Sequence, residues 1–195
     1  PVHIDDTNFL ALAAGATQDP WRPHDARINW QGSTERAFDV LSNPPGIGWW
    51  LAPVVDSPIW LMHLWMFPWL LLAIWGSWQL GTRFTGRPEA TALLICGAPV
   101  AMLATQSFTP DLPLLAYTVA GFGGLTRQGA SSPDKRWAWA LLLGSSALFR
   151  YSGLALIPLV FAWGWRLGGR RTALILGSAA ALPGLALAAH DLMAY

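Results

Sequence analysis

Two adjacent carboxylates mark the stretch of this chain with the clearest capacity for chemistry. Asp5 and Asp6 stand directly before apolar residues that recur at helical spacing, namely Phe9, Leu10, Leu12 and Ala13. A carboxylate at such a position can act as a general base toward a hydroxyl group. It can equally stabilise the start of a helix by pairing with free backbone N–H groups and with the helix dipole. This stretch alone leaves both interpretations open.

Two further charged residues border apolar runs. Asp111 lies in Thr109-Pro110-Asp111, where Thr109 can cap a helix and Pro110 can take its first position. A carboxylate placed deep in a bilayer costs about 2.5–3.5 kcal/mol, so Asp111 is also a functional candidate. Arg150 either anchors the chain by extending its side chain to the membrane surface or binds a phosphate through the planar donor groups of its guanidinium.

The segment Asn43-Pro44-Pro45-Gly46 directly precedes the first long apolar stretch. Its two prolines restrict the backbone to an extended turn, which either forms a rigid loop exit or shapes a site. The four histidines show no metal-ligand spacing, and we predict no metal ligand among them. Cys96 is the only cysteine, lies in an apolar run and is expected to be a small buried hydrophobic residue.

The composition indicates an integral membrane protein. Of the 195 residues, 53% are hydrophobic and only 12% are charged, which is about half the charge of a typical soluble domain. The apolar residues form blocks that are long enough to cross or nearly cross a bilayer. The formal charge of +1, without a basic arm or an aromatic and basic patch, favours no nucleic-acid partner.

The chain divides into two parts. Residues 1–57 are polar, rich in Trp, Pro and Asp, and are predicted to form a large loop at the membrane surface with short surface helices. Residues 58–195 are predicted to form a bundle of about six transmembrane or membrane-embedded helices, at 58–80, 89–105, 111–125, 137–149, 152–165 and 172–189. The shorter stretches would be tilted or buried among other helices. Tryptophans near the predicted ends, including Trp137, are typical of membrane interfaces.

If all six stretches cross the membrane, the charges separate between its two sides. Eight of the twelve basic residues fall on one side, which the positive-inside rule assigns to the cytoplasm. Nine of the eleven acidic residues fall on the other side. This predicts a plasma-membrane protein whose Asp5, Asp6, Asp111 and Arg150 face the periplasm or the cell exterior. Because the chain begins at Pro1 with no signal peptide, we expect a fragment that starts after a first transmembrane helix.

These motifs, taken in order, resemble a known enzyme class. The chain is similar to the membrane glycosyltransferases of the GT-C class, in particular glycosyltransferase family 39, the protein O-mannosyltransferases and the lipid A aminoarabinose transferases. The resemblance covers nearly all of the chain and rests on five segments: 5–13, 28–32, 43–45, 109–111 and 148–153. It departs from the family where Asp6 replaces a frequent Glu, Asn8 a frequent Arg and Asn43 a frequent Lys.

The resemblance implies an all-helical fold and a catalytic site on the external face. It implies that Asp5 is the general base, with Asp6 and Asp111 as further catalytic residues. Arg150 and Asn43 would bind the phosphate of a polyprenyl-phosphate sugar donor, and Pro44 and Pro45 would shape the loop. The acceptor would be a lipid, a glycan or a protein, membrane lipids would surround the helices, and a divalent cation stays open as a cofactor.

Two other functions remain open on the sequence. In a transporter, Asp111 and Arg150 would form a charge pair along a substrate path. The predicted charges gather at one face rather than at mid-membrane, which favours the enzyme. In a non-catalytic scaffold, the large loop would bind a partner protein. A sugar transfer needs a base for the acceptor hydroxyl and a cation for the departing phosphate, and the sequence contains candidates for both.

Overall fold

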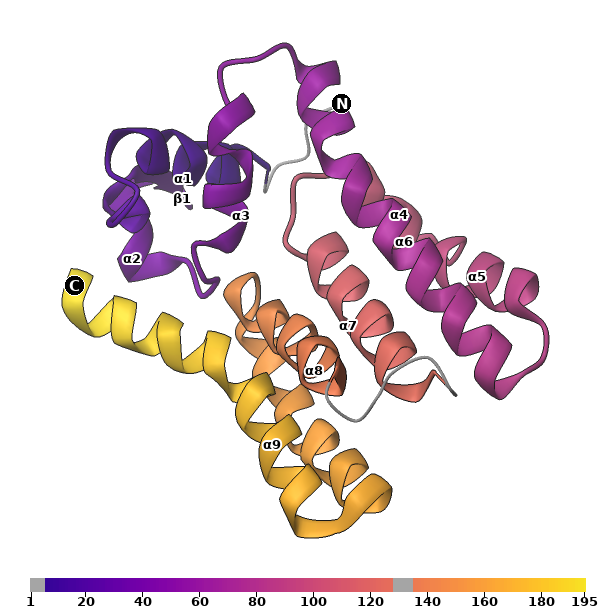
Figure 1. Ribbon diagram of the computed structural model, residues 1–195. Helices are drawn as coiled ribbons and strands as arrows, with labels where there is room; N and C mark the ends of the chain where they lie inside the picture. Colours follow the sequence, from indigo (N-terminus) through magenta and orange to yellow (C-terminus); the bar gives the residue numbers. More distant parts are fainter. Residues whose placement is uncertain (1–5, 128–134) are drawn as a thin grey trace.

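The computed structural model describes residues 6–127 and 135–195. The described residues are mostly helical, which confirms the predicted helical class (Figure 1). They also include a two-stranded sheet in the N-terminal region, which the sequence analysis did not predict. The residues before Asp6 and residues 128–134 are outside this description.

The N-terminal region forms short elements, as expected. They are α1 (Asp6–Gln18), the 3₁₀ helix η1 (Pro23–Asp25), β1 (Arg27–Trp30), β2 (Ser33–Arg36), α2 (Ala37–Val40), α3 (Gly46–Leu51) and the 3₁₀ helix η2 (Ala52–Val54). The strands pair antiparallel around Gln31 and Gly32, whose positive φ angles of 52° and 91° form a two-residue turn. Gly at the second turn position is the signal from which this hairpin could have been predicted.

The apolar stretches form helices close to the predicted bounds. The helices are α4 (Ile59–Phe84), α5 (Pro88–Cys96), α6 (Pro99–Thr105), α7 (Asp111–Thr126), α8 (Arg136–Gly144) and α9 (Leu156–Ala194), with 3₁₀ helices η4 (Ser145–Leu148) and η5 (Tyr151–Ala155) between the last two. Among the residues that the structure describes, two helices are long and apolar enough to cross a membrane, Ile59–Phe84 and Tyr151–Ala194. A third crossing results if α5 and α6 together form one span.

Two breaks modify the predicted helices. The stretch predicted at 89–105 is helical but is not one continuous helix, because α5 and α6 meet at an angle of 67°. Pro99 lacks an N–H and disfavours a helical residue before it, and Ala98 accordingly has an extended backbone (φ −60°, ψ 141°). Helix α9 folds back at Gly168 and Gly169, where the dihedral angles are not helical. This break separates the last two predicted stretches.

Helix α4 packs closely on α7, and α8 packs closely on α9, through glycine. A Cβ atom at Gly76 of α4 would collide with the backbone of Ala120 in α7. A Cβ atom at Gly144 of α8 would likewise collide with the carbonyl oxygen of Ala180 in α9. Such close approaches between helices need residues without side chains. Helices α4 and α7 lie side by side along their length (Figure 1).

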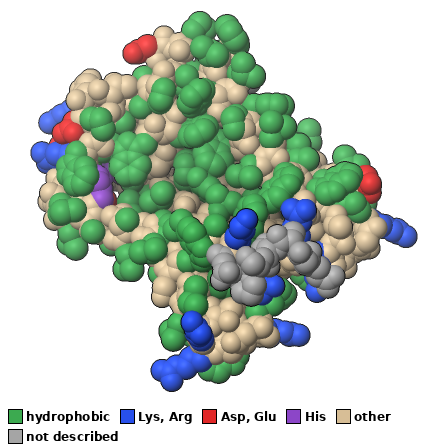
Figure 2. All heavy atoms as spheres, in the orientation of Figure 1, with side chains coloured by type: hydrophobic (Ala, Val, Ile, Leu, Met, Phe, Trp, Pro, Cys, Tyr) green, Lys and Arg blue, Asp and Glu red, His purple; other side chains and the backbone are tan. Residues whose placement is uncertain are grey.

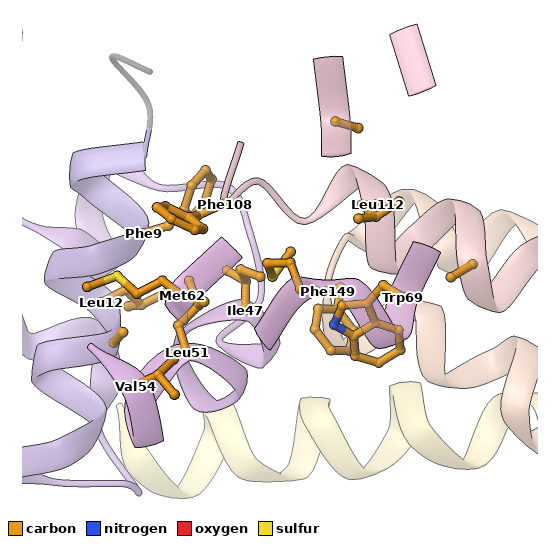
Figure 3. Packing of buried hydrophobic residues seen from close by; sticks show 14 of the residues in the cluster. Phe9, Leu12, Ile47, Leu51, Val54, Met62, Trp69, Phe108, Leu112 and Phe149 are labelled. Atoms are coloured by element: carbon orange, nitrogen blue, oxygen red, sulfur yellow. The ribbon is translucent and has the colours of Figure 1, made fainter. Parts of the chain in front are cut away.

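One hydrophobic core joins the N-terminal region to the helices. Phe9 and Leu12 of α1 pack with residues of α3, α4 and α7, and Ile47 and Leu51 are fully buried among them (Figure 3). Each such side chain contributes about 1.5–3 kcal/mol by leaving water. The predicted surface loop is therefore a packed cap on one end of the bundle rather than a mobile connection.

The far end of α9 also contacts this cap. The His24 side chain donates through Nε2 to the carbonyl oxygen of Asn43 at 2.9 Å, and the His24 backbone N–H donates to the Tyr195 hydroxyl at 2.9 Å. His190 donates through Nε2 to the carbonyl oxygen of Trp21 at 2.8 Å. Both histidines are buried. The contact holds residue 43, one of the predicted site residues, at a fixed place.

Acidification is expected to weaken this contact. Burial lowers the pKa of His24 below 6.5, and this exceeds the opposing effects of the Asn43 carbonyl and Asp191. The unfolded chain then binds more protons, so stability is complete above about pH 6.5 and falls as the pH falls below it. The midpoint of thermal unfolding should drop between pH 7.5 and pH 5, and His24→Gln should reduce the drop. Equal drops in both proteins would contradict the assignment.

Candidate functional site

An ion pair joins the two charged residues that the sequence singled out at the edges of apolar runs. Arg150 Nη1 donates to Asp111 Oδ1, although the residues are 39 positions apart. Helix α7 begins at Asp111, and Arg150 lies in the extended link between η4 and η5. The predicted cap by Thr109 was wrong, since the Thr109 hydroxyl bonds with Ser107 Oγ at 3.0 Å.

The ion pair lines a small polar cavity of about 210 Å³. Its polar walls are Asn8 of α1, Asn43, Thr109, Asp111 and Arg150, and its apolar walls are Phe9, Leu41 and Pro110. Four segments that lie far apart in the sequence therefore meet at one cavity. Asn8 and Thr109 were not predicted as site residues. Asn8 is a polar side chain in an otherwise apolar helical pattern, which could have indicated its role.

The Asn-Pro-Pro segment brings Asn43 to the cavity. Pro44 and Pro45 are buried, and α3 starts at the next residue, Gly46. A Cβ atom at Gly46 would collide with the carbonyl oxygen of Leu148, so the loop packs directly against the segment that carries Arg150. The loop-shaping role of the two prolines stays a prediction.

The two acidic residues at the start of the chain differ in what the structure describes. Asp5, the predicted base, lies outside the described residues. Asp6 is fully buried, does not line the polar cavity, and accepts a hydrogen bond from the Phe108 backbone N–H at 2.7 Å. This bond connects the start of α1 to the segment just before α7. The geometry of Asp6 favours a structural role over the catalytic one predicted for it.

A second cavity of about 390 Å³ lies beside the first and shares Asp111 with it. Its walls come from α5, α6 and α7 and are almost entirely apolar: Ile95, Ala98, Val100, Ala101, Ala104, Leu114, Leu115 and Thr118. A polar cavity and an apolar cavity that meet at one carboxylate match a ligand with a charged head and a hydrocarbon tail. Ligand sites of this kind combine apolar walls with a few polar groups.

Stability alone does not account for the ion pair. The side chains of Arg150 and Asp111 are 40% and 42% exposed, and exposed ion pairs contribute only about 0.2–1 kcal/mol. The pair lies at the rim of a cavity, where a ligand can contact it. Within residues 6–127 and 135–195, no group of three His, Cys, Asp or Glu side chains lies in an arrangement that could hold a metal ion.

Comparison of the chain with protein-family models, with curated proteins and with solved structures found no match.

Proposed function

We propose that the protein is a multi-pass membrane glycosyltransferase that moves a sugar from a polyprenyl-phosphate donor to an acceptor hydroxyl. The observation that carries this proposal is the Asp111–Arg150 pair, which lines a polar cavity and whose Asp111 also lines an apolar cavity. Arg150 provides donors for a phosphate, and the apolar cavity suits an isoprenoid chain. Asn43 adds a neutral polar group to the same wall.

Several features support a membrane location. Large apolar side chains are exposed on the helices, among them Trp60 at 65%, Leu94 at 76% and Val100 at 77%. Hydrophobic side chains cover much of the face in Figure 2. Soluble proteins rarely expose contiguous apolar surface on this scale. The proposal keeps the six crossings predicted from the sequence and places the N-terminal cap outside the plasma membrane, as the charge separation in the sequence predicts.

Single cysteines test this orientation directly. In a Cys96→Ala background, Thr34→Cys places a thiol on exposed β2, and Arg87→Cys places one between α4 and α5, where the side chain is also exposed. A thiol reagent that does not cross membranes should label Thr34→Cys in intact cells and Arg87→Cys only after permeabilisation. Labelling of both from outside would contradict the proposed number of crossings.

The proposed transfer is a single displacement. The acceptor oxygen attacks the anomeric carbon while the bond from that carbon to the donor phosphate breaks, so the configuration inverts. Asp5 takes the hydroxyl proton, and Arg150 stabilises the negative charge on the departing polyprenyl phosphate. Asp111 occupies Nη1 of the guanidinium, which has five N–H donors in all, so the phosphate can bind others.

An assay of the purified protein with a panel of polyprenyl-phosphate sugars tests the proposal. We expect release of polyprenyl phosphate that requires an acceptor hydroxyl. Absence of release with every donor and acceptor would count against the transferase. Uptake of a solute into proteoliposomes by the same preparation would instead support the transporter, in which Asp111 and Arg150 line a substrate path.

A further inference from the structure

A large cavity lies at the opposite end of the helical bundle from Asp111. Its volume is about 740 Å³, and its walls come from the start of α8 and from both sides of the break in α9. The location follows from the packing, because Trp139 near the start of α8 lies against Gly124 near the end of α7. In Figure 2, Lys and Arg side chains gather over this end of the molecule.

Two guanidinium groups line the cavity. Arg136 comes from the first turn of α8, and Arg171 follows the break in α9. Neither has an ion-pair partner among the carboxylates of the described residues. Arginine presents planar, paired donors that match the oxygen atoms of a phosphate group. The cavity therefore has the chemistry of an anion site.

The other walls of the cavity are apolar and exposed. Trp137 is 49% exposed, Ile175 51% and Leu167 38%, and all three lie beside the two arginines. A free phosphate ion would make no favourable contact with these apolar side chains. A phospholipid uses both parts, because its phosphate binds the guanidinium groups while its glycerol and acyl chains cover the apolar side chains. Tryptophan is also the residue preferred at the level of lipid headgroups.

The break in α9 adds to the attraction for an anion. Gly169 has a left-handed φ of 69°, and the second half of the helix starts just after it. Gly168, Arg171 and Thr172 all line the cavity, so the first turn of this half-helix faces it. The positive end of a helix dipole favours a negative group at such a place.

We propose that this cavity binds the phosphate headgroup of one acidic phospholipid from the cytoplasmic leaflet. The inference rests on the membrane orientation proposed above and does not depend on sugar transfer. Basic pockets between membrane helices on the cytoplasmic side recognise acidic headgroups in this way. The bound lipid would thereby connect α8 to the two halves of α9 and fix their relative positions.

Lipid retention by the purified protein tests this proposal. The protein is exchanged into detergent with phosphatidylglycerol or phosphatidylcholine, and bound lipid is counted by native mass spectrometry. One phosphatidylglycerol should remain bound, and its apparent affinity should fall at least 10-fold in the double variant Arg136→Gln/Arg171→Gln. The matched control, Arg166→Gln/Arg170→Gln, removes the same charge from residues outside the cavity and should retain the lipid.

Three results would overturn the proposal. In the first, the two double variants lose bound phosphatidylglycerol equally. In the second, the protein retains phosphatidylglycerol and phosphatidylcholine equally. In the third, inorganic phosphate at a matched concentration displaces the lipid. If a variant does not fold, the site can still be tested by crosslinking a photoactivatable phosphatidylglycerol to the protein without substitutions. Its label should fall on the peptides of Trp137 or Ile175, and a label confined to other helices would refute the site. Because no donor sugar is present, failure here leaves the proposed transferase standing.

Discussion

Asp5→Asn in the membrane-embedded protein is expected to reduce sugar transfer by about 100-fold to 10,000-fold. An amide cannot accept the proton of the acceptor hydroxyl, and loss of a general base costs a factor of this size. Expression and membrane insertion should be unchanged, since asparagine is as good a helix cap as aspartate. The measurement is the turnover rate at saturating donor and acceptor.

Asp6→Asn is the matched control, because it makes the same chemical change one residue later. The Asp6 carboxylate accepts the Phe108 N–H, and the oxygen of asparagine can keep that bond. Transfer should therefore persist at a measurable fraction, whereas Asp6→Ala should destabilise the protein by about 1–3 kcal/mol through an unpaired buried N–H. Near-normal turnover of Asp5→Asn would make Asp5 a helix cap and Asp111 the leading candidate for the base.

Arg150→Lys is expected to weaken donor binding by about 10-fold to 100-fold. Lysine keeps the positive charge but loses the planar fork, and hydrogen bonds to charged groups contribute about 1.5–3 kcal/mol each, where 1.4 kcal/mol corresponds to a factor of ten. The readout is the apparent affinity for the lipid-linked sugar. The fold should remain intact, because the pair that Arg150 forms with Asp111 is partly exposed and contributes little to stability.

Arg36→Lys provides the control for Arg150→Lys. Arg36 also forms ion pairs with carboxylates, those of Asp25 and Asp39, but it does not line the polar cavity. Its replacement should leave donor affinity unchanged. If Arg150→Lys also leaves the affinity unchanged, Arg150 is a membrane anchor and the phosphate binds elsewhere.

The helical elements could be predicted from the sequence to within a few residues in most cases. Helix α7 was predicted at 111–125 and observed at Asp111–Thr126. Helix α4 begins one residue after the predicted start and ends four residues after the predicted end, at Phe84. Long apolar runs determine helices because every backbone polar group must be paired within the segment when its surroundings are apolar. This property is local, so one sequence is enough to reveal it.

Only part of the candidate site could be predicted from the sequence. Asp111, Arg150 and Asn43 could be chosen because charged or polar residues at the edges of apolar runs are uncommon. Their meeting at one cavity, together with Asn8, could not be deduced. Periodicity shows which face of a helix is apolar, but it does not show which other helix covers that face.

By itself, the sequence determined the helical class and the apolar stretches, and it predicted that the charges separate between the two sides of a membrane. Only the tertiary structure decided that Arg150 pairs with Asp111, that Asp6 is buried against Phe108, and that the end of α9 contacts His24. The physical reason is that these contacts depend on how closely helices approach one another. Glycines such as Gly76 and Gly144 set that approach through the side chains they lack.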